Sequence, residues 1–194
     1  MRVIAGRLKG RVLSAPKGDR TRPTTDRVRE SLFSALTSIL GVDLGGGAVL
    51  DAFAGSGALG IESLSRGCSS ATFVENDRAA ATTLARNLDS VGLKGCSRVV
   101  VTDVLSAVKR GTLSGGPFAL ILLDPPYRLA WRDIVGMTSE LVYHELIADG
   151  AAVVYEHAAD STVEWPSCFG LVWRRKYGST EIDIVVYERE AGAS

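Results

Sequence analysis

Four acidic residues in this 194-residue sequence each follow an apolar run that is typical of a buried strand. They are Asp51, Glu75, Asp103 and Asp124. Carboxylates accept hydrogen bonds from hydroxyl and amino groups, so a row of them can hold a ribose and an amine. Because parallel strands present their carboxyl ends at one edge of a sheet, we expect these side chains to face one ligand site there.

A glycine-rich turn follows the first of these strands. Gly55, Gly57 and Gly60 fit the pattern G-x-G-x-x-G. Residues without a side chain let backbone N–H groups approach a ligand beside a helix N-terminus. Such turns are often purely structural, so the pattern alone is weak evidence. Glu75, at the end of the next strand, adds a carboxylate that can accept hydrogen bonds from both hydroxyls of a ribose.

A second motif, Asp124-Pro125-Pro126-Tyr127, follows the fourth strand. Both prolines fix φ and lack an N–H group, and Pro125 holds Asp124 in an extended conformation. The turn therefore offers only hydrogen-bond acceptors, followed by an aromatic ring. Such acceptors can bind the two N–H groups of an exocyclic amine while the ring stacks on its base. The amine lone pair is then free to attack an electrophile, and Asp124 stabilises the positive charge that develops.

The pattern from residue 48 alternates between strands and helices. We expect strands at Ala48–Ala54, Ala71–Val74, Arg98–Thr102, Phe118–Leu123 and Ala151–Tyr155, and helices at Gly60–Arg66, Arg78–Ser90, Leu105–Arg110 and Trp131–Leu146. An earlier amphipathic helix is expected from Thr24/Thr25 to Gly41. The alternation implies a doubly wound parallel sheet, and therefore an α/β, Rossmann-like fold. The runs Gly170–Tyr177 and Glu181–Glu188 predict an antiparallel hairpin at the C-terminus.

The net charge is zero, but the charges are unevenly distributed. Residues 1–30 hold nine basic and three acidic residues, whereas the remaining 164 hold 13 basic and 19 acidic residues. This asymmetry suggests an arm that contacts a polyanion, although a merely solvated terminus is the alternative. Within the arm, Arg2–Ala5 and Gly10–Leu13 predict a small hairpin. We therefore expect a basic N-terminal hairpin at residues 1–24 and one larger domain at residues 25–194.

The composition excludes several classes of protein. A hydrophobic share of 46% with 23% charged residues excludes a disordered chain. The longest apolar run, Phe118–Leu123, is too short to cross a bilayer, and we expect no signal peptide. Cys68, Cys96 and Cys168 are too widely spaced for a disulfide framework or a metal site. We expect a cytoplasmic protein, monomeric and without a metal ion.

Taken in order, these motifs resemble the class I S-adenosylmethionine-dependent methyltransferases that modify amino groups, whose fold also ends in an antiparallel hairpin. More narrowly, the R-P-T-T-D-R-V-R-E-S-L-F segment at residues 22–33 and F-A-G-S-G-A-L-G at residues 53–60 resemble the RsmD family. This family methylates a guanine N2 of small-subunit (16S) ribosomal RNA. The resemblance extends over residues 2–189.

The resemblance implies a role for individual residues. The cofactor S-adenosylmethionine would be bound by Asp51, Phe53, Gly55, Gly57, Glu75, Asn76, Asp103 and Val104. The guanine amino group would be bound by Asp124 and Pro125, with Tyr127 stacked on the base, as the catalytic residues. The ribosomal RNA, or its assembly particle, would be contacted by Arg7, Lys9, Arg11, Arg22, Thr24 and Arg27.

Three alternatives remain open at this point. The Asp-Pro-Pro-Tyr motif also serves other planar amines, such as adenine N6 in RNA or DNA, and only the resemblance selects guanine. The glycine turn would suit an NAD-dependent oxidoreductase, although 194 residues leave little room for a substrate domain. A non-catalytic RNA-binding module is the third possibility, and the intact Asp124–Tyr127 motif argues against it.

Overall fold

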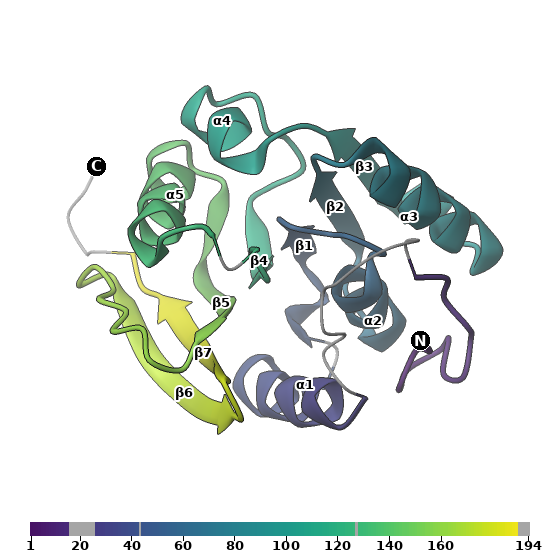
Figure 1. Ribbon diagram of the computed structural model, residues 1–194, viewed down its shortest axis with the longest axis horizontal. Helices are drawn as coiled ribbons and strands as arrows, with labels where there is room; N and C mark the ends of the chain where they lie inside the picture. The colour runs from purple at the N-terminus through teal and green to yellow at the C-terminus, as the bar shows by residue number, and fades with distance from the viewer. Residues whose placement is uncertain (16–25, 43, 127, 190–194) are drawn as a thin grey trace.

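The computed structural model describes residues 1–15, 26–42, 44–126 and 128–189 (Figure 1). Its centre is a seven-stranded sheet in the order β3-β2-β1-β4-β5-β7-β6. The strands are β1 (Ala48–Asp51), β2 (Ser70–Glu75), β3 (Ser97–Val101), β4 (Phe118–Leu123), β5 (Ile147–Ala158), β6 (Phe169–Tyr177) and β7 (Thr180–Tyr187). Strands β1 to β5 pair in parallel, and β7 is antiparallel to both β5 and β6. The predicted doubly wound sheet with a C-terminal hairpin is confirmed.

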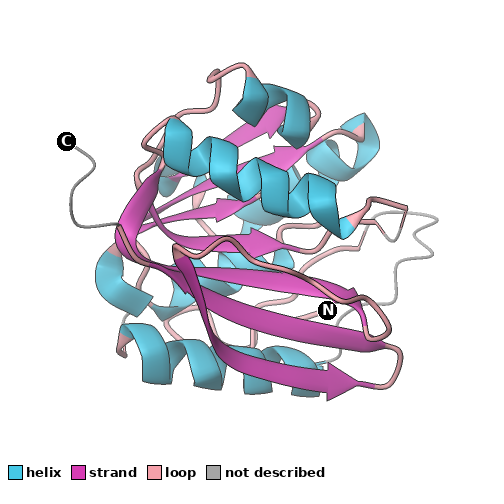
Figure 2. Ribbon diagram, turned by 90° about the vertical axis from the view of Figure 1, so that its left-hand side faces the viewer, coloured by secondary structure: helices cyan, strands magenta, loops and turns pink. Residues whose placement is uncertain are grey.

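Helices cover both faces of the sheet (Figure 2). The helices are α1 (Asp26–Leu40), α2 (Ala58–Arg66), α3 (Arg78–Ser90), α4 (Val104–Lys109) and α5 (Trp131–Tyr143). Buried side chains of α1, α2 and α3 pack on one face, and those of α4 and α5 pack on the other. None of the helices in the described ranges is long and apolar enough to span a membrane.

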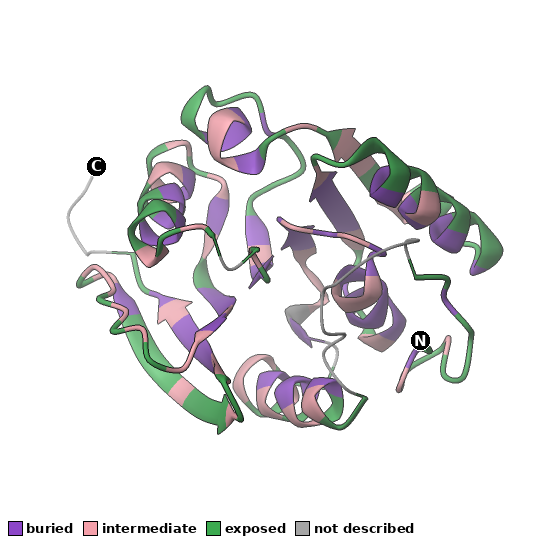
Figure 3. Cartoon of the chain, in the orientation of Figure 1, coloured by how far each residue is buried: buried purple, intermediate pink, exposed green. Residues whose placement is uncertain are grey.

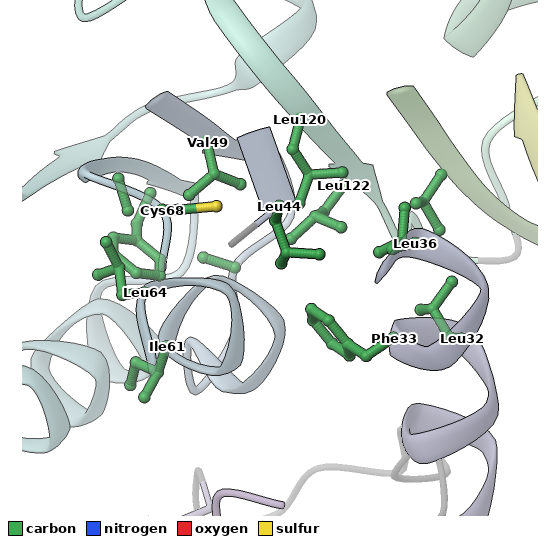
Figure 4. Close-up of a cluster of buried hydrophobic side chains, with 14 of the residues drawn as sticks. Leu32, Phe33, Leu36, Leu44, Val49, Ile61, Leu64, Cys68, Leu120 and Leu122 are labelled. Carbon is green, nitrogen blue, oxygen red and sulfur yellow. The ribbon is translucent and has the colours of Figure 1, made fainter. Parts of the chain in front are cut away.

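Strand β4 shows why the apolar runs are continuous. Leu120 and Leu122 belong to the core under α1 and α2, which Figure 4 shows in close-up. Ile121 and Leu123 belong to the core under α4 and α5. Successive side chains of a strand point to opposite faces, so a strand covered on both faces must be apolar at every position.

Helix α1 is amphipathic, as its sequence predicts. Leu32, Phe33 and Leu36 are at most 2% exposed and point toward the sheet (Figure 4). The opposite side of the helix is exposed (Figure 3). The predicted start at Thr24/Thr25 lies outside the described residues, and the helix ends before Gly41, whose φ is 92°.

Three predicted elements have bounds that differ from the structure by three residues or more. Strand β1 ends at Asp51 rather than at residue 54, because the chain turns there into the glycine motif. The helix expected at Trp131–Leu146 ends at Tyr143, since Glu145 adopts a φ of 55° that no α-helix contains. The next strand therefore begins early, at Ile147, and continues to Ala158.

The N-terminal segment forms less strand structure than expected. The two predicted strands of the hairpin reduce to one isolated antiparallel bridge, between Arg2 and Val12. The N–H groups of Val3 and Gly10 donate to the carbonyls of Arg11 and Val3, respectively, so the segment does fold back on itself. A lone two-stranded ribbon is marginal in water, which is consistent with such sparse pairing.

Contacts with α2 hold this segment against the domain. The carboxylate of Glu62, which is fully buried, accepts hydrogen bonds from the Ile4 N–H at 2.7 Å and the Ala5 N–H at 3.0 Å. The Arg66 Nε donates to the same carboxylate at 2.7 Å. Gly6 has a φ of 79°, and a Cβ there would lie 1.9 Å from the Ser65 carbonyl oxygen, so only glycine fits.

A charged cluster lies beneath the C-terminal hairpin. Arg174 donates to both carboxylate oxygens of Asp183, at 2.6 and 2.7 Å. His157 Nδ1 lies 3.0 Å from the Ala158 carbonyl, and Nε2 lies 3.5 Å from Asp183. Burial opposes the charged imidazolium, but Asp183, the Ala158 carbonyl and Glu181 together raise the pKa of His157. One ring nitrogen of His157 and one carboxylate oxygen each of Glu181 and Asp183, the types of atom that can bind a metal ion, lie within 4.8 Å of one another. Arg174 supplies positive charge to this group.

The buried Glu62 carboxylate generates a prediction about the arm. Glu62→Gln replaces one acceptor oxygen with an NH₂ group that faces backbone N–H groups. We expect a loss of about 2–4 kcal/mol in the free energy of unfolding, measured in urea, because each lost buried hydrogen bond costs about 1–3 kcal/mol. Trypsin should also cut faster after Arg7, Lys9 and Arg11. The exposed Glu164→Gln is the control, and equal stability of the two variants would contradict this role.

Candidate functional site

The four acidic residues singled out from the sequence lie at one edge of the sheet. Asp51 and Glu75 are the last residues of β1 and β2. Asp103 lies two residues beyond β3, and Asp124 directly follows β4. The strand order β3-β2-β1-β4 makes these four strands neighbours (Figure 1). The predicted convergence of the four carboxylates on one edge is therefore what the fold produces.

The glycines of the β1–α2 turn fall into two groups. A Cβ on Gly57 would lie 2.3 Å from Leu84 Cδ1, and one on Gly60 would lie 2.3 Å from Phe73 Cε1. These two glycines let α2 pack closely on its neighbours. Gly55 has a φ of 52°, and a Cβ there would meet no atom of the described residues within 4 Å. The space above Gly55 is thus available to a ligand.

Asp51 is a buried acid with one backbone partner. It is 3% exposed, and its Oδ2 accepts a hydrogen bond from the Gly60 N–H at 3.0 Å. Burial raises the pKa of Asp51 to about 7; the Gly60 bond opposes this shift, and the nearby charge of Glu75 adds to it. The residue therefore ties the first turn of α2 to the end of β1, and its proton affinity is far above that of an ordinary carboxyl group.

Glu75 joins the glycine turn to the end of β2. Its Oε2 accepts from the Gly55 N–H and its Oε1 from the Asp77 N–H, both at 2.7 Å. A carboxylate has about four acceptor positions, so two remain available to a ligand. Phe53 is half-buried in the turn, and Asn76 is exposed beside Glu75.

Asp103 begins the third strand-to-helix turn of the site. Its carboxylate accepts from the Ser106 N–H at 2.8 Å and so caps α4. The side chain of Asp103 is exposed, while Val104 is buried and anchors the helix in the core. The Asp103 carboxylate and the Val104 backbone thus stand at the outer end of the row of acids.

The Asp124-Pro125-Pro126 segment leaves the sheet as the sequence predicts. Asp124 is exposed and Pro125 is half-buried. The two prolines also line a small cavity of about 50 Å³, together with Trp131, Tyr155 and His157 among others. Tyr127 lies outside the described residues. The acceptors of Asp124 and Pro125 are therefore presented at the same edge as Gly55.

The basic residues assigned to RNA divide by location. Arg7, Lys9 and Arg11 are exposed on the N-terminal segment, and Arg27 is exposed on the first turn of α1. Arg22 and Thr24 lie outside the described residues. By contrast, Arg29 is 2% exposed and donates to Asp26 and to the Arg2 carbonyl, so its charge serves the fold.

Sequence reasoning missed the polar residues that fix the N-terminal segment. Ser65 accepts from the Leu8 N–H and donates to the Ala5 carbonyl. Asn87 accepts from the Ser14 N–H and donates to the carbonyls of Ser14 and Ser56. The only signal in the sequence was a polar residue on the apolar face of a predicted helix. This signal does not identify the backbone group to which the residue is hydrogen-bonded.

The buried Asp51 generates a prediction about pH. Because folding raises its pKa above the usual value of 3.8, the folded state favours the protonated acid, and stability is lost as the pH rises from 3.8 to about 7. Asp51→Asn stays neutral, so its free energy of unfolding relative to that of the wild type should increase by on the order of 3 kcal/mol between pH 5 and pH 9. Urea unfolding across this range measures the difference. A gap that stays constant with pH, as expected for the exposed control Asp160→Asn, would contradict the assignment.

The chain matches known proteins over almost its full length. The family model described as "Conserved hypothetical protein 95" matches residues 1–186. The YlbH protein of Bacillus subtilis is 39% identical over 187 residues, covering 95% of this chain and 97% of that protein. "Ribosomal RNA small subunit methyltransferase D" of Escherichia coli is 35% identical over 192 residues, covering 98% and 91%.

A solved structure agrees with these relatives. The yhhF protein of Escherichia coli has a TM-score of 0.82 and 34% sequence identity, with 97% of this chain and 98% of that chain covered. The fold is that of the class I methyltransferases. The expected resemblance is confirmed: the chain belongs to the RsmD family, the family that the matching model describes as conserved hypothetical protein 95.

Proposed function

We propose that this protein transfers a methyl group from S-adenosylmethionine to the exocyclic N2 amine of a guanine in small-subunit ribosomal RNA. The observation that carries the proposal is the carboxyl edge of the sheet, where the open space over Gly55 lies next to the acceptor-only turn of Asp124 and Pro125. The name of the Escherichia coli relative supports the ribosomal RNA substrate. Guanine N2, rather than another planar amine, follows from membership of the family.

The residues at this edge fit S-adenosylmethionine. Gly55 leaves room for a ligand, and Gly57 continues the same turn. Glu75 keeps acceptor positions for the ribose hydroxyls, with Asn76 beside it. Asp103 and the Val104 N–H lie one strand further on, within reach of an adenine, while Asp51 and Phe53 support the turn. The bound cofactor supplies an electrophilic methyl group.

The Asp124 turn prepares the amine. The Asp124 carboxylate and the Pro125 carbonyl accept the two N–H groups of the guanine N2, and Tyr127 stacks on the base. These bonds turn the nitrogen lone pair out of conjugation and toward the methyl group, and Asp124 stabilises the positive charge that develops on nitrogen. With the cofactor bound, the new N–C bond would form as the methyl–sulfur bond breaks, the neutral thioether S-adenosylhomocysteine would be the leaving group, and the nitrogen would lose a proton to solvent.

The basic arm, residues 1–24, supplies contacts to RNA phosphates ahead of a methyltransferase domain at residues 25–194. Its contributors are Arg7, Lys9, Arg11, Arg22, Thr24 and, from α1, Arg27. Phosphate contacts offset the few kcal/mol needed to extrude a base from structured RNA. The enzyme acts as a monomer in the cytoplasm, on ribosomal RNA or on its assembly particle.

Two alanine substitutions in the glycine turn separate ligand binding from packing. Gly55→Ala places a methyl group in the space proposed for the ligand, so we expect at least about a tenfold loss of S-adenosylmethionine affinity, measured by calorimetry. The free energy of unfolding should fall by about 1 kcal/mol, because alanine is strained at a positive φ. Gly57→Ala meets Leu84 and should cost stability first, by about 1–3 kcal/mol. If the Gly55→Ala variant bound the cofactor with unchanged affinity, the proposal that the cofactor binds at this turn would be refuted.

Asp124→Ala tests the catalytic assignment. We expect S-adenosylmethionine to bind normally while methyl transfer to 16S ribosomal RNA falls at least about a hundredfold, because charge stabilisation in the transition state is lost. Tritium transfer measures the rate, and mass spectrometry of nucleosides identifies N2-methylguanosine. The exposed Asp133→Ala on α5 is the matched control. An active Asp124→Ala enzyme, or a product other than N2-methylguanosine, would overturn the corresponding part of the proposal.

A further inference from the structure

A groove lies between α1 and β6, apart from the residues proposed to bind the cofactor and the amine, and it includes Arg27, one of the RNA contacts proposed above. Its volume is about 660 Å³. Small polar side chains such as Ser31 and Ser34 line the helix side, and Trp173 lies on the strand side. Arg27 and Arg175 contribute positive charge, and Glu30 is the acidic residue among the lining side chains. Figure 1 shows α1 beside the end of β6.

Neighbours hold the Arg175 side chain in place although it is exposed. Its guanidinium donates to Ser31 Oγ at 3.0 Å and lies 5.7 Å from the centre of the Tyr177 ring. The Tyr177 hydroxyl donates to the same Ser31 Oγ at 2.8 Å. Arg174, next in sequence, instead has its charge matched by Asp183. Arg175 is thus a pre-oriented cation with guanidinium donors left for a ligand, since Arg has five N–H groups.

The Arg175 end of the groove lies at the same edge of the sheet as the proposed catalytic turn. Strand β6 ends at Tyr177, which pairs with Thr180, and Thr180 pairs in turn with Ala158 at the carboxyl end of β5. Three strand spacings, about 14 Å in all, separate β6 from β4 and the turn of Asp124. An extended polymer bound at Asp124 can therefore continue into the groove.

We propose that this groove binds a single-stranded segment of the substrate RNA next to the target base. Arg27 and Arg175 contact phosphates, and a neighbouring base packs against Trp173. A basic groove with an aromatic side chain in its wall is typical of proteins that bind single strands. The proposal rests on the function proposed above, since it places the groove on the path of the RNA that carries the target guanine.

Two kinds of variant test the groove. Arg27→Ala/Arg175→Ala removes its cations, and Ser34→Trp fills it without changing the charge. Lys109→Ala/Arg110→Ala, at the exposed end of α4, is the control with the same loss of charge. Fluorescence anisotropy with a labelled oligouridylate of about twelve nucleotides measures affinity at several salt concentrations. Thermal unfolding confirms that each variant is folded.

We expect the arginine pair to weaken binding about tenfold and to reduce the slope of log affinity against log salt by about 1.4, since each phosphate contact to a single strand contributes about 0.7. Ser34→Trp should weaken binding about fivefold or more. Binding by the arginine pair equal to that of the Lys109/Arg110 control, or normal binding by Ser34→Trp, would overturn the proposal.

Methyl transfer by the wild type separates this proposal from the function on which it rests. Transfer to 16S ribosomal RNA by the wild type, with unaltered oligouridylate binding by the groove variants, refutes the groove alone. No transfer by the wild type to naked RNA or to an assembly particle refutes the proposed function. Variants that bind the oligouridylate normally but fail only on the assembled particle would show that a protein occupies the groove, which also overturns the proposal.

Discussion

The hydrogen bond from the Gly55 N–H to the Glu75 carboxylate is the contact on which the candidate site depends. It spans 2.7 Å and joins the β1–α2 turn to the end of the neighbouring strand. Asp51 holds the other end of the same turn through the Gly60 N–H. Two acidic side chains thus accept hydrogen bonds from backbone N–H groups of one loop. These bonds fix the position of the loop, and no side chain of the loop needs to occupy the space proposed for the ligand.

The N-terminal segment owes its position to a second buried carboxylate. Glu62 accepts two backbone N–H groups of the segment, while Ser65 accepts the Leu8 N–H and Asn87 the Ser14 N–H. Val3 and Leu13 add apolar contacts because both are buried in the core of the domain. Residues 1–15 are therefore ordered against α2 and α3, so Arg7, Lys9 and Arg11 are presented from a fixed backbone rather than from a free chain.

Much of the fold could be read from the sequence because its signals are local. The strand Phe118–Leu123 and the helix Arg78–Ser90 have the predicted bounds, since a continuous apolar run marks the strand and Asp77 caps the amphipathic helix. The errors lie where local patterns compete. The apolar residues at 141–147 continue a helical pattern, but Glu145 turns the chain with a positive φ that the pattern does not reveal.

The sequence by itself determined which residues lie at the carboxyl edge, because strand ends and parallel topology together place Asp51, Glu75, Asp103 and Asp124 there. Only the tertiary structure decided what surrounds them. The pKa of Asp51 near 7 arises from burial under α2, and the division between packing glycines and the open Gly55 depends on side chains far away in the sequence. Desolvation and steric fit are properties of the packed neighbours, so no local pattern encodes them.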